Sequence, residues 1–324
     1  MTASAEKTFA SVIDPLAAPA RLKRAIYAIG NFDGVHRGHA AVIARTRNVA
    51  AEIGVPSAAL TFEPHPADFF ARRPVVFRLT PAPMKIRALQ ALGLDGVVTL
   101  TFNAALAALT AEEFVAKILV ERLGVSAVII GGDFHFGKGR GGSPTFLLDA
   151  GRRHGFRVDV IEKIEASASP DAPAISSTAI RRALEAGDVE TAARLIGRSY
   201  AISGEVIAGR KLGRTLGVPT ANIELPATNR LAHGIYAVRA TVEDKRFDGV
   251  ASFGTRPTVD DGQPLLEVFL FDFSGDLYGK AMEVAFEAHL RPERKFDGLE
   301  ALKAQMNEDI AQARAILKQR GGDI

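Results

Sequence analysis

Two histidines three residues apart mark the segment of this sequence best suited to chemistry. Residues 30–39 read GNFDGVHRGH, between a predicted strand, Ala25–Ile29, and a predicted helix, Ala40–Ile53. The glycines let the backbone turn sharply and approach a ligand closely. A helix start offers unpaired N–H groups and partial positive charge, and His36 and His39 lie on one side of that turn. These features predict a site that binds phosphate. A metal pair is disfavoured because no third ligand stands nearby.

Hydroxyls and an arginine form a second group of phosphate-binding residue types. Residues 175–181 read ISSTAIR, in which Ser177 and Thr178 open a predicted helix and Arg181 lies one turn further on. Taken alone, the segment is more typical of an ordinary helix N-cap followed by a surface arginine.

Two imperfect nucleotide-binding patterns occur in residues 131–142, GGDFHFGKGRGG. The P-loop pattern has Gly139 where a Ser or Thr should hold Mg²⁺. The dinucleotide pattern begins at Gly137, and six residues separate it from the predicted strand end at Ile130, where it should follow directly. Both matches are weak, and neither predicts a cofactor.

A glycine-rich basic segment opens the second half of the chain. Residues 209–222 read GRKLGRTLGVPTAN, and their glycines and basic side chains suit a polyphosphate (Gly209, Arg210, Lys211, Gly213, Arg214 and Gly217). Thr220 and Asn222 offer the hard oxygen atoms that Mg²⁺ prefers. A basic hairpin without a ligand is the alternative.

A single carboxylate stands in the apolar segment Leu265–Phe273, LLEVFLFDF. Strand alternation puts Glu267 on one face with Phe269, Phe271 and Phe273. A carboxylate among aromatic rings is costly to bury without a partner, which predicts either a position at a mouth or a function. A salt bridge at a strand edge is the alternative.

The hydrophobic pattern divides the chain into two parts that position these residues. In the first, strands and helices alternate, which implies a doubly wound parallel sheet with helices on both faces and ligands at the carboxyl ends of the strands. From Tyr200 onward short strands dominate and one amphipathic helix follows, which predicts an antiparallel β-barrel or sandwich with a terminal α-helix. We therefore expect an α/β fold with domains 1–186 and 187–324. The predicted strands are 25–29, 57–62, 96–102, 127–130, 156–161, 201–207, 234–241, 247–253, 265–273 and 281–288; the predicted helices before the terminal one are 40–53, 84–92, 110–123, 146–154 and 177–186, followed by a short piece ending near 197.

The N-terminal motifs resemble the nucleotidyltransferase superfamily. Residues 30–39 are similar to its HxGH motif, in the form found in the flavin branch, and ISSTAIR resembles the motif that accompanies it. The resemblance implies that His36 and His39 hold the ATP phosphates during adenylyl transfer. It implies ATP contacts for further residues of both segments as well (Gly30, Asn31, Asp33, Gly34, Ser177, Thr178 and Arg181).

Two further loops resemble the same flavin branch. Residues 131–137 are similar to its G-D-F-R-F-G loop, which implies a ligand contact for Asp133, although His135 stands in place of the usual Arg. Residues 62–66, FEPHP, resemble another loop of this branch, with His65 either a ligand contact or a solvated turn residue.

The C-terminal motifs resemble riboflavin kinases. The resemblance implies that Thr220 and Asn222 bind Mg–ATP, with Gly209, Lys211 and Gly213 at the nucleotide. It also implies that Glu267 takes the proton from the ribityl 5′-hydroxyl, and that Arg291, in LRPERKF, holds the flavin or a phosphate. Ser252 stands where relatives usually have Asn.

Together these resemblances are those of the bacterial bifunctional riboflavin kinase/FAD synthetase family. They imply ATP-dependent conversion of riboflavin to FMN by the C-terminal domain, and of FMN to FAD and pyrophosphate by the N-terminal domain, with Mg²⁺. One alternative is a nucleotidyltransferase for nicotinamide or pantetheine phosphates with an appended barrel. Another is a non-catalytic flavin-sensing or RNA-binding regulator.

Composition narrows the class of protein and its partners. The 324 residues are 47% hydrophobic and 24% charged, the balance of a globular protein with substantial cores. The absence of Cys excludes disulfides, a thiol nucleophile and Cys-ligated metals. No apolar stretch is long enough for a membrane span, no secretory signal is evident, and a net charge of +3 without a basic block disfavours nucleic acid. We expect a cytoplasmic enzyme of small molecules, without nucleic-acid or membrane partners, as a monomer or weak homo-oligomer.

Overall fold

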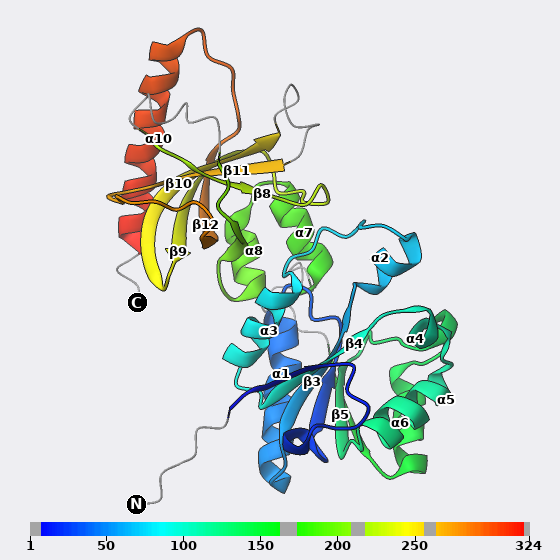
Figure 1. Ribbon diagram of the computed structural model, residues 1–324. Helices are drawn as coiled ribbons and strands as arrows, with labels where there is room; N and C mark the ends of the chain where they lie inside the picture. Colours follow the sequence, from blue (N-terminus) through cyan, green and yellow to red (C-terminus); the bar gives the residue numbers. More distant parts are fainter. Residues whose placement is uncertain (1–7, 163–173, 209–217, 256–263, 321–324) are drawn as a thin grey trace, which may run out of the picture. The chain divides into compact units, whose positions relative to one another are not determined.

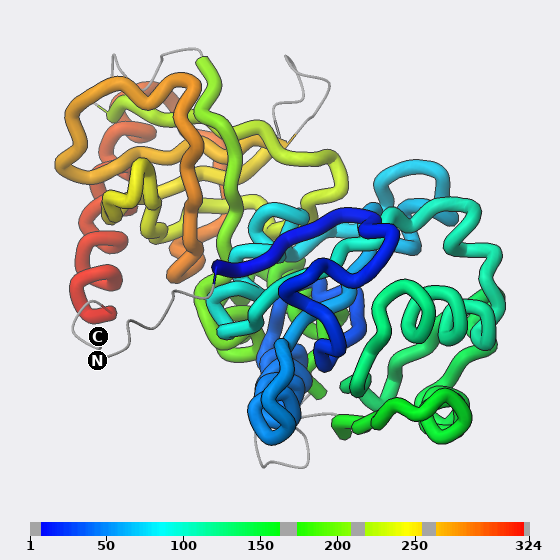
Figure 2. Tube along the Cα trace, turned by 60° about the horizontal axis from the view of Figure 1, so that its bottom comes forward, coloured from blue at the N-terminus to red at the C-terminus, as the bar shows by residue number. Residues whose placement is uncertain are grey.

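The computed structural model describes residues 8–162, 174–208, 218–255 and 264–320 (Figures 1 and 2). Its contacts divide the chain into two compact units, Met1–Ser176 and Ser177–Ile324. Helix α7 (Ser177–Glu185) lies between this division and the domain boundary expected at residue 186, which stays a prediction.

The first unit is built on a sheet of six parallel strands. Their order across the sheet is β1-β4-β3-β2-β5-β6. The chain therefore runs outward in one direction from β2 and in the other from β5, so the topological switch point lies between these two neighbouring strands. The strands are β1 (Ala10–Ile13), β2 (Ile26–Ile29), β3 (Ser57–Glu63), β4 (Gly96–Thr101), β5 (Ala127–Gly131) and β6 (Arg157–Ile161).

Helices cover both faces of this sheet (Figure 1). Ile26 and Ala28 of β2 pack with α1 (Arg37–Ile53) and α3 (Ala82–Ala91) on one side. Tyr27 and Ile29 pack on the other side with the π-helical segment η2 (Phe114–Arg122) and with α6 (Pro144–His154). Because successive residues of a strand point to opposite faces, a strand buried on both sides reads as a continuous apolar run. The shorter elements are η1 (Ala20–Leu22), α2 (Pro66–Ala71), α4 (Ala104–Ala108), α5 (Ala111–Glu113) and η3 (Lys138–Arg140).

The second unit is an antiparallel sheet curled into a nearly closed barrel. The strand order is β7-β12-β9-β10-β11-β8, and a bridge between Ile207 and Asn222 links the two ends of the sheet. Helices α7 and α8 (Val189–Ile196) precede it, and α10 (Leu299–Arg320) follows it. The strands are β7 (Tyr200–Glu205), β8 (Ala221–Glu224), β9 (Gly234–Val242), β10 (Lys245–Thr255), β11 (Pro264–Leu270) and β12 (Ala281–Arg291). The predicted fold class is confirmed in both units.

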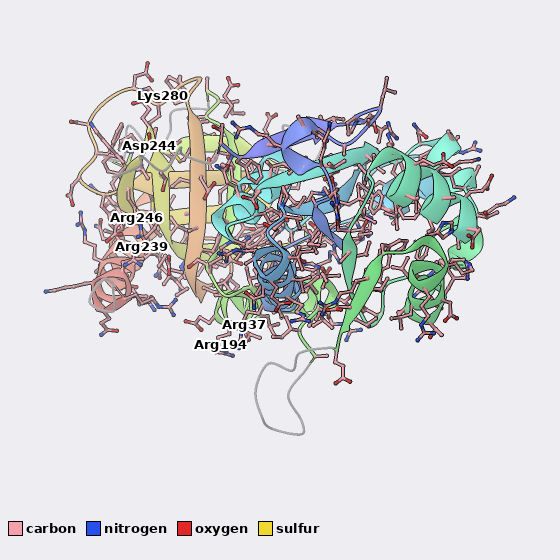
Figure 3. All side chains as sticks on the ribbon, turned by 90° about the horizontal axis from the view of Figure 1, so that it is seen from below. Arg37, Arg194, Arg239, Asp244, Arg246 and Lys280 are labelled. Atoms are coloured by element: carbon pink, nitrogen blue, oxygen red, sulfur yellow. The ribbon has the colours of Figure 1, made fainter. Side chains whose placement is uncertain are left out.

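Helix α10 packs on the outer face of the barrel. Its Ala313 and Leu317 join a core with Ala237, Phe271 and Ala288 of the second unit. Arg239, a nearly buried arginine on β9 (Figure 3), donates from Nη2 to the Leu317 carbonyl at 2.8 Å and pairs through Nε with Asp248 at 3.2 Å. The last turn of the helix is therefore tied to the sheet by a charged side chain as well as by apolar contact.

The alternation expected beyond Glu267 holds as far as Phe271 and is wrong for Phe273. Strand β11 ends at Leu270, and Asp272 adopts a left-handed φ of 57°, which turns the chain away from the sheet. Phe271 packs beside Phe269 in the core under α10, with the two ring centres 5.8 Å apart and the Arg314 guanidinium 4.3 Å from the Phe271 ring centre. Phe273, beyond the turn, makes an edge contact with Phe247 instead. The aromatic face expected around Glu267 therefore retains Phe269 and Phe271 but not Phe273.

Candidate functional site

The segment that leads from the end of β2 to the two histidines lies at the topological switch point of the parallel sheet. Residues 30–36, hereafter the phosphate loop, leave the carboxyl end of β2 and lead into α1. Asp133 follows the carboxyl end of β5, which pairs directly with β2. The sheet therefore brings together two segments that lie about a hundred residues apart in sequence, at the edge where doubly wound folds bind ligands.

The phosphate loop is held in an unusual backbone conformation. Phe32, Gly34 and Val35 have φ values of 49°, 92° and 41°. For residues with a side chain, the left-handed region costs roughly 1 kcal/mol or more and persists only when the surroundings enforce it. The loop conformation therefore depends on contacts from outside the loop.

His36 and His39 form a reciprocal cap at the start of α1. Nδ1 of His36 accepts a hydrogen bond from the His39 backbone N–H, and Nδ1 of His39 accepts from the His36 backbone N–H, both at 3.3 Å. The two rings stack with centroids 3.6 Å apart. Because both Nδ1 atoms act as acceptors, the neutral rings carry their protons on Nε2. The pair thus presents two N–H donors from one helix turn, as a phosphate site requires.

The charge state of His39 follows from its surroundings. Desolvation first, and then the nearby His36 and the Lys85 ammonium, hold the pKa of His39 well below its usual value of 6.5. The ring is therefore neutral at pH 7, the state in which Nδ1 can cap the helix.

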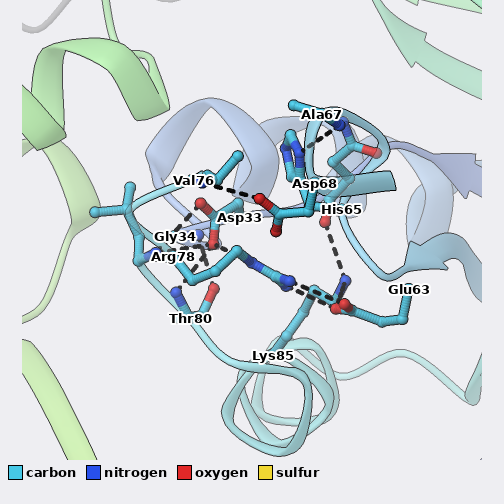
Figure 4. A network of polar contacts seen from close by, with 12 residues as sticks. Asp33, Gly34, Glu63, His65, Ala67, Asp68, Val76, Arg78, Thr80 and Lys85 are labelled. Carbon is cyan, nitrogen blue, oxygen red and sulfur yellow. Dashed lines mark hydrogen bonds and ion pairs between the residues drawn. The ribbon is translucent and has the colours of Figure 1, made fainter. Parts of the chain in front are cut away.

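A second chain segment holds the middle of the phosphate loop (Figure 4). The buried Asp33 carboxylate accepts hydrogen bonds from the backbone N–H groups of Leu79 and Thr80, each at 3.0 Å. The Gly34 N–H donates to Thr80 Oγ1 at 2.7 Å. Asp33, expected to contact ATP, thus fixes the loop to residues 79–80, and its ATP contact stays a prediction.

Three charged residues that the sequence did not single out lie next to Asp33. Arg78 donates two hydrogen bonds to Glu63, at 2.9 and 2.7 Å, and its Nε lies 3.6 Å from the Asp33 carboxylate. Lys85 Nζ lies 2.6 Å from Glu63 Oε1. Burial tends to raise the pKa of Glu63, but Arg78 and Lys85 outweigh it and hold that pKa below its usual value. Only the spacing of Lys85 within a predicted helix was visible in the sequence, because its partners come from other elements.

The remaining predicted residues of the first site lie on loop and helix termini. His65 caps α2 by accepting from the Ala67 N–H at 3.2 Å, and His135 Nδ1 lies 2.9 Å from the Asp133 carbonyl oxygen. Ser177, Thr178 and Arg181 belong to the first turns of α7, a helix that the sequence predicts. This helix falls in the second unit, whereas the sequence analysis expected these residues in domain 1–186. Their contacts with ATP stay predictions.

The strand register of the second unit aligns its candidate residues in one row. Across β8, β11, β10, β9 and β12, each residue is the direct partner of the next: Asn222, Glu267, Ser252, Ile235 and Arg291. Direct partners share a face of the sheet, with Cβ atoms about 4.5–5.5 Å apart. This Glu267 row therefore places the half-buried carboxylate between Asn222 and Ser252.

Asn222 has the properties of a ligand for a hard cation. Its side chain is buried, and among the described residues its Oδ1 has no hydrogen-bond partner. Its Nδ2 donates to the carbonyl of Thr220 at 3.4 Å, which leaves the oxygen, rather than the nitrogen, available. A buried carbonyl oxygen without a partner is costly, and a Mg²⁺ ion would satisfy it. Gly209, Lys211 and Gly213, also predicted at this site, lie outside the described residues.

Arg291, at the other end of the row, is engaged by α10. Its Nε and Nη2 donate to the two carboxylate oxygens of the buried Asp309, at 2.9 and 2.8 Å. Its Nη1 donates to the Pro292 carbonyl at 3.0 Å. The guanidinium therefore anchors α10 to β12, and the predicted flavin or phosphate contact of Arg291 stays a prediction.

Two kinds of feature are absent from the part of the chain that the structure describes. Within residues 8–162, 174–208, 218–255 and 264–320, no three His, Asp or Glu side chains are grouped as metal ligands. Among the helices in those ranges, none is both long enough and apolar enough to cross a membrane.

The chain is similar to known proteins along most of its length. A family model for FAD synthetase matches residues 18–179, and one for riboflavin kinase matches residues 196–317. Bifunctional riboflavin kinase/FMN adenylyltransferases from Pseudomonas fluorescens, Haemophilus influenzae and Escherichia coli K12 are 46%, 42% and 39% identical to it. These alignments cover 89% of this chain in each case, and 91%, 92% and 91% of the relatives.

One solved structure resembles the whole chain. It is a Streptococcus pneumoniae protein described as a macrolide-efflux protein, with a TM-score of 0.80 and 27% identity. The match covers 92% of this chain and 97% of the other.

Proposed function

Because this chain belongs to the family of bifunctional riboflavin kinase/FMN adenylyltransferases, we propose that the two sites described above each carry one of its two reactions. The enzyme phosphorylates riboflavin with ATP to give FMN, and transfers AMP from ATP to FMN to give FAD. Adenylyl transfer belongs to the first unit, whose residues match the FAD synthetase family, and phosphorylation to the second.

In the first unit, the phosphate loop and the histidine pair bind ATP. An oxygen of the FMN phosphate attacks the α-phosphorus, and the bond from that phosphorus to the bridging oxygen breaks to release pyrophosphate. Negative charge builds up on the phosphoryl oxygens during this step. The Nε2–H groups of His36 and His39, together with the N-terminus of α1, donate to those oxygens, which supports the assignment of both histidines as catalytic.

In the second unit, Glu267 accepts the proton of the ribityl 5′-hydroxyl. The hydroxyl oxygen then attacks the γ-phosphorus of ATP, and the bond to the β–γ bridging oxygen breaks to release ADP. Asn222 and Thr220 would hold Mg²⁺, which when bound offsets the charge of the ATP phosphates. Glu267 and the proposed metal ligand are direct cross-strand partners, and this observation carries the assignment.

One incubation tests both assignments. Flavin-free protein is incubated with riboflavin, ATP and Mg²⁺, and riboflavin, FMN and FAD are separated by chromatography over time. FAD that appears after FMN supports both sites. FMN alone would contradict the assignment of the first unit, and no product at all would favour a non-catalytic flavin- or RNA-binding regulator.

The substrates also indicate the cellular location and the partners of the enzyme. We place the enzyme in the cytoplasm, where ATP is abundant, as a monomer or weak homo-oligomer without nucleic-acid or membrane partners. The other alternative, a nucleotidyltransferase for nicotinamide or pantetheine phosphates, would make no FAD in this assay and would adenylylate those phosphates when they are supplied with ATP instead.

A further inference from the structure

A lysine ammonium is buried beneath the phosphate loop. The Lys85 side chain on α3 is 1% exposed, although it carries a charge that strongly prefers water. Burial lowers the pKa of Lys85, partly opposed by the charge of Glu63. A lysine kept inside a protein at this cost is held there by specific oxygen partners, and those partners show what it does.

The oxygen partners of Lys85 lie at or just beyond the ends of two neighbouring strands, and Figure 4 shows one of them, Glu63. Its Nζ lies 3.1 Å from Thr61 Oγ1, 3.3 Å from the Phe62 carbonyl and 2.6 Å from Glu63 Oε1, all at the end of β3. It also donates at 3.2 Å to the carbonyl of Asn31, the second residue of the phosphate loop. The ammonium therefore fastens the loop that follows β2 to the carboxyl end of β3.

The Asn31 carbonyl oxygen accepts hydrogen bonds from two side chains. In addition to Lys85, the hydroxyl of the fully buried Thr61 donates to it at 3.2 Å. The next residue, Phe32, begins the strained stretch of the loop that leads to the histidine pair. The orientation of this one peptide group thus sets the direction in which the chain enters the strained turns.

We propose that Lys85 is a positioning residue for adenylyl transfer, which acts through the Asn31 carbonyl to hold the phosphate loop in the orientation that binds ATP. This inference rests on the proposed role of the first unit. Lys85 reaches the loop by its hydrogen bond to the Asn31 carbonyl, so its influence passes through the backbone of residues 31–36 and through its charge. The same charge helps to keep His39 neutral.

The charges around Lys85 indicate which substitution can test its positioning role without leaving a buried charge unpaired. Lys85 and Arg78 face Glu63 and Asp33, so that two cations and two carboxylates balance. In Lys85→Met, Glu63 keeps its double hydrogen bond from Arg78. Thr61→Val is a milder second variant that keeps the side-chain shape but removes the hydroxyl, and Thr61→Ser retains the hydroxyl. Lys117→Met removes an exposed lysine paired with Glu113 at 3.0 Å on the same unit, and is the matched control.

The experiment measures both activities of the full-length chain, with FMN supplied for the adenylyl transfer. In Lys85→Met we expect kcat/KM for ATP in adenylyl transfer to fall about 10- to 100-fold through a raised KM as well as a lowered kcat. Riboflavin phosphorylation should stay at the wild-type rate and report that the second unit is intact. Thr61→Val should show the same pattern, reduced to about threefold to tenfold, whereas Thr61→Ser and Lys117→Met should resemble the wild type.

A purely structural role predicts a different result. Loss of folded protein lowers the apparent kcat but leaves the KM for ATP unchanged, and that outcome in both Lys85→Met and Thr61→Val would overturn the proposal. If Lys85→Met does not fold, Thr61→Val decides alone. A wild-type protein that makes FMN but no FAD would instead overturn the proposed function of the first unit.

Discussion

The phosphate loop of the first unit and the Glu267 row of the second unit both gather residues from distant parts of the sequence, but by different means. The phosphate loop lies beyond the end of a strand, and its strained turns are held by side chains and backbone N–H groups of residues 61–85. The Glu267 row lies within the sheet, and the backbone ladder sets Glu267 opposite Asn222. One site depends on a buried network of charges, whereas the other depends on strand register.

This difference determines where each site is vulnerable. A ladder tolerates changes in side chains that do not react, because the backbone hydrogen bonds keep the remaining residues in place. A loop held by buried polar groups is sensitive to any substitution that leaves one of those groups without a partner. The variants below separate these two cases, in order of decreasing expected effect.

Removing the proposed base should nearly abolish one activity alone. Glu267→Gln keeps the side-chain volume but cannot accept the proton, so the rate of FMN formation should fall by about a hundredfold to ten-thousandfold. Conversion of supplied FMN to FAD should proceed at the wild-type rate, as measured by chromatography. Glu224→Gln is the control, because Glu224 is exposed and lies on the same face of β8 as Asn222. Loss of both activities would mean that the two units are not independent.

Removing one histidine should produce the reverse pattern with a somewhat smaller effect. His36→Asn retains a good helix N-cap but loses the ring N–H, so FAD formation should fall roughly a hundredfold while FMN formation persists. His36→Ala removes the cap as well and should be more severe in FAD formation. An FAD output at the wild-type level in either variant would refute the phosphate role of the pair.

Replacing Asp33, which holds the middle of the phosphate loop, should lower the free energy of unfolding of the first unit but not of the second. In Asp33→Asn the amide oxygen can still accept from Leu79 and Thr80, but N–H₂ replaces the second oxygen, 3.2 Å from the Leu79 nitrogen, and the negative charge beside Arg78 is lost. We expect this change to destabilise the first unit by about 1–3 kcal/mol. Denaturant titrations followed through each activity measure this separately. The midpoint for FAD formation should shift to lower denaturant, and the midpoint for FMN formation should not. A common shift would contradict the contrast between the sites.

The smallest effect concerns pH. Because the pKa of folded His39 lies well below 6.5, the unfolded chain binds a proton that the folded chain excludes once the pH falls through about 6.5. The contribution of His39 is therefore complete above pH 6.5 and decreases below it, with a slope of at most about 1.4 kcal/mol per pH unit. His39→Gln keeps the capping box without this titration, so the stability of its first unit should fall less between pH 7 and pH 5. Parallel curves for the two proteins would show that His39 is not desolvated.

Much of this architecture could be predicted because it follows local patterns. The strand predicted at 57–62 is β3, and the capping box expected at Thr110 and Glu113 is present. The motif at 30–39 lies directly after β2, with His36 as the N-cap of α1. Periodicity and helix-capping chemistry act over a few residues, so they are readable from the chain itself.

The parts that could not be predicted depend on contacts distant in sequence. Strand β1 is a four-residue edge strand that exists only by pairing with β4, 86 residues away in the register Ala10 to Gly96. Lys85 lies on a correctly predicted helix, but its partners are 23, 24 and 54 residues earlier in the chain. The end of β11 at Leu270 follows from the turn at Asp272 and from the apolar contact that α10 offers to Phe271. No local pattern contains this information.

The arrangement of the Glu267 row also links the activity of the proposed kinase site to the folding of the whole barrel. Its five members come from five strands spread over residues 221–291, and a slip of one residue between any two would send a member to the opposite face. A fragment of the barrel that lacks β8 or β11 lacks Asn222 or Glu267, the proposed metal ligand or the proposed base. During refolding, riboflavin phosphorylation should therefore return only when the barrel is complete. The recovery of this activity would then report that all the strands of the barrel are paired in the native register.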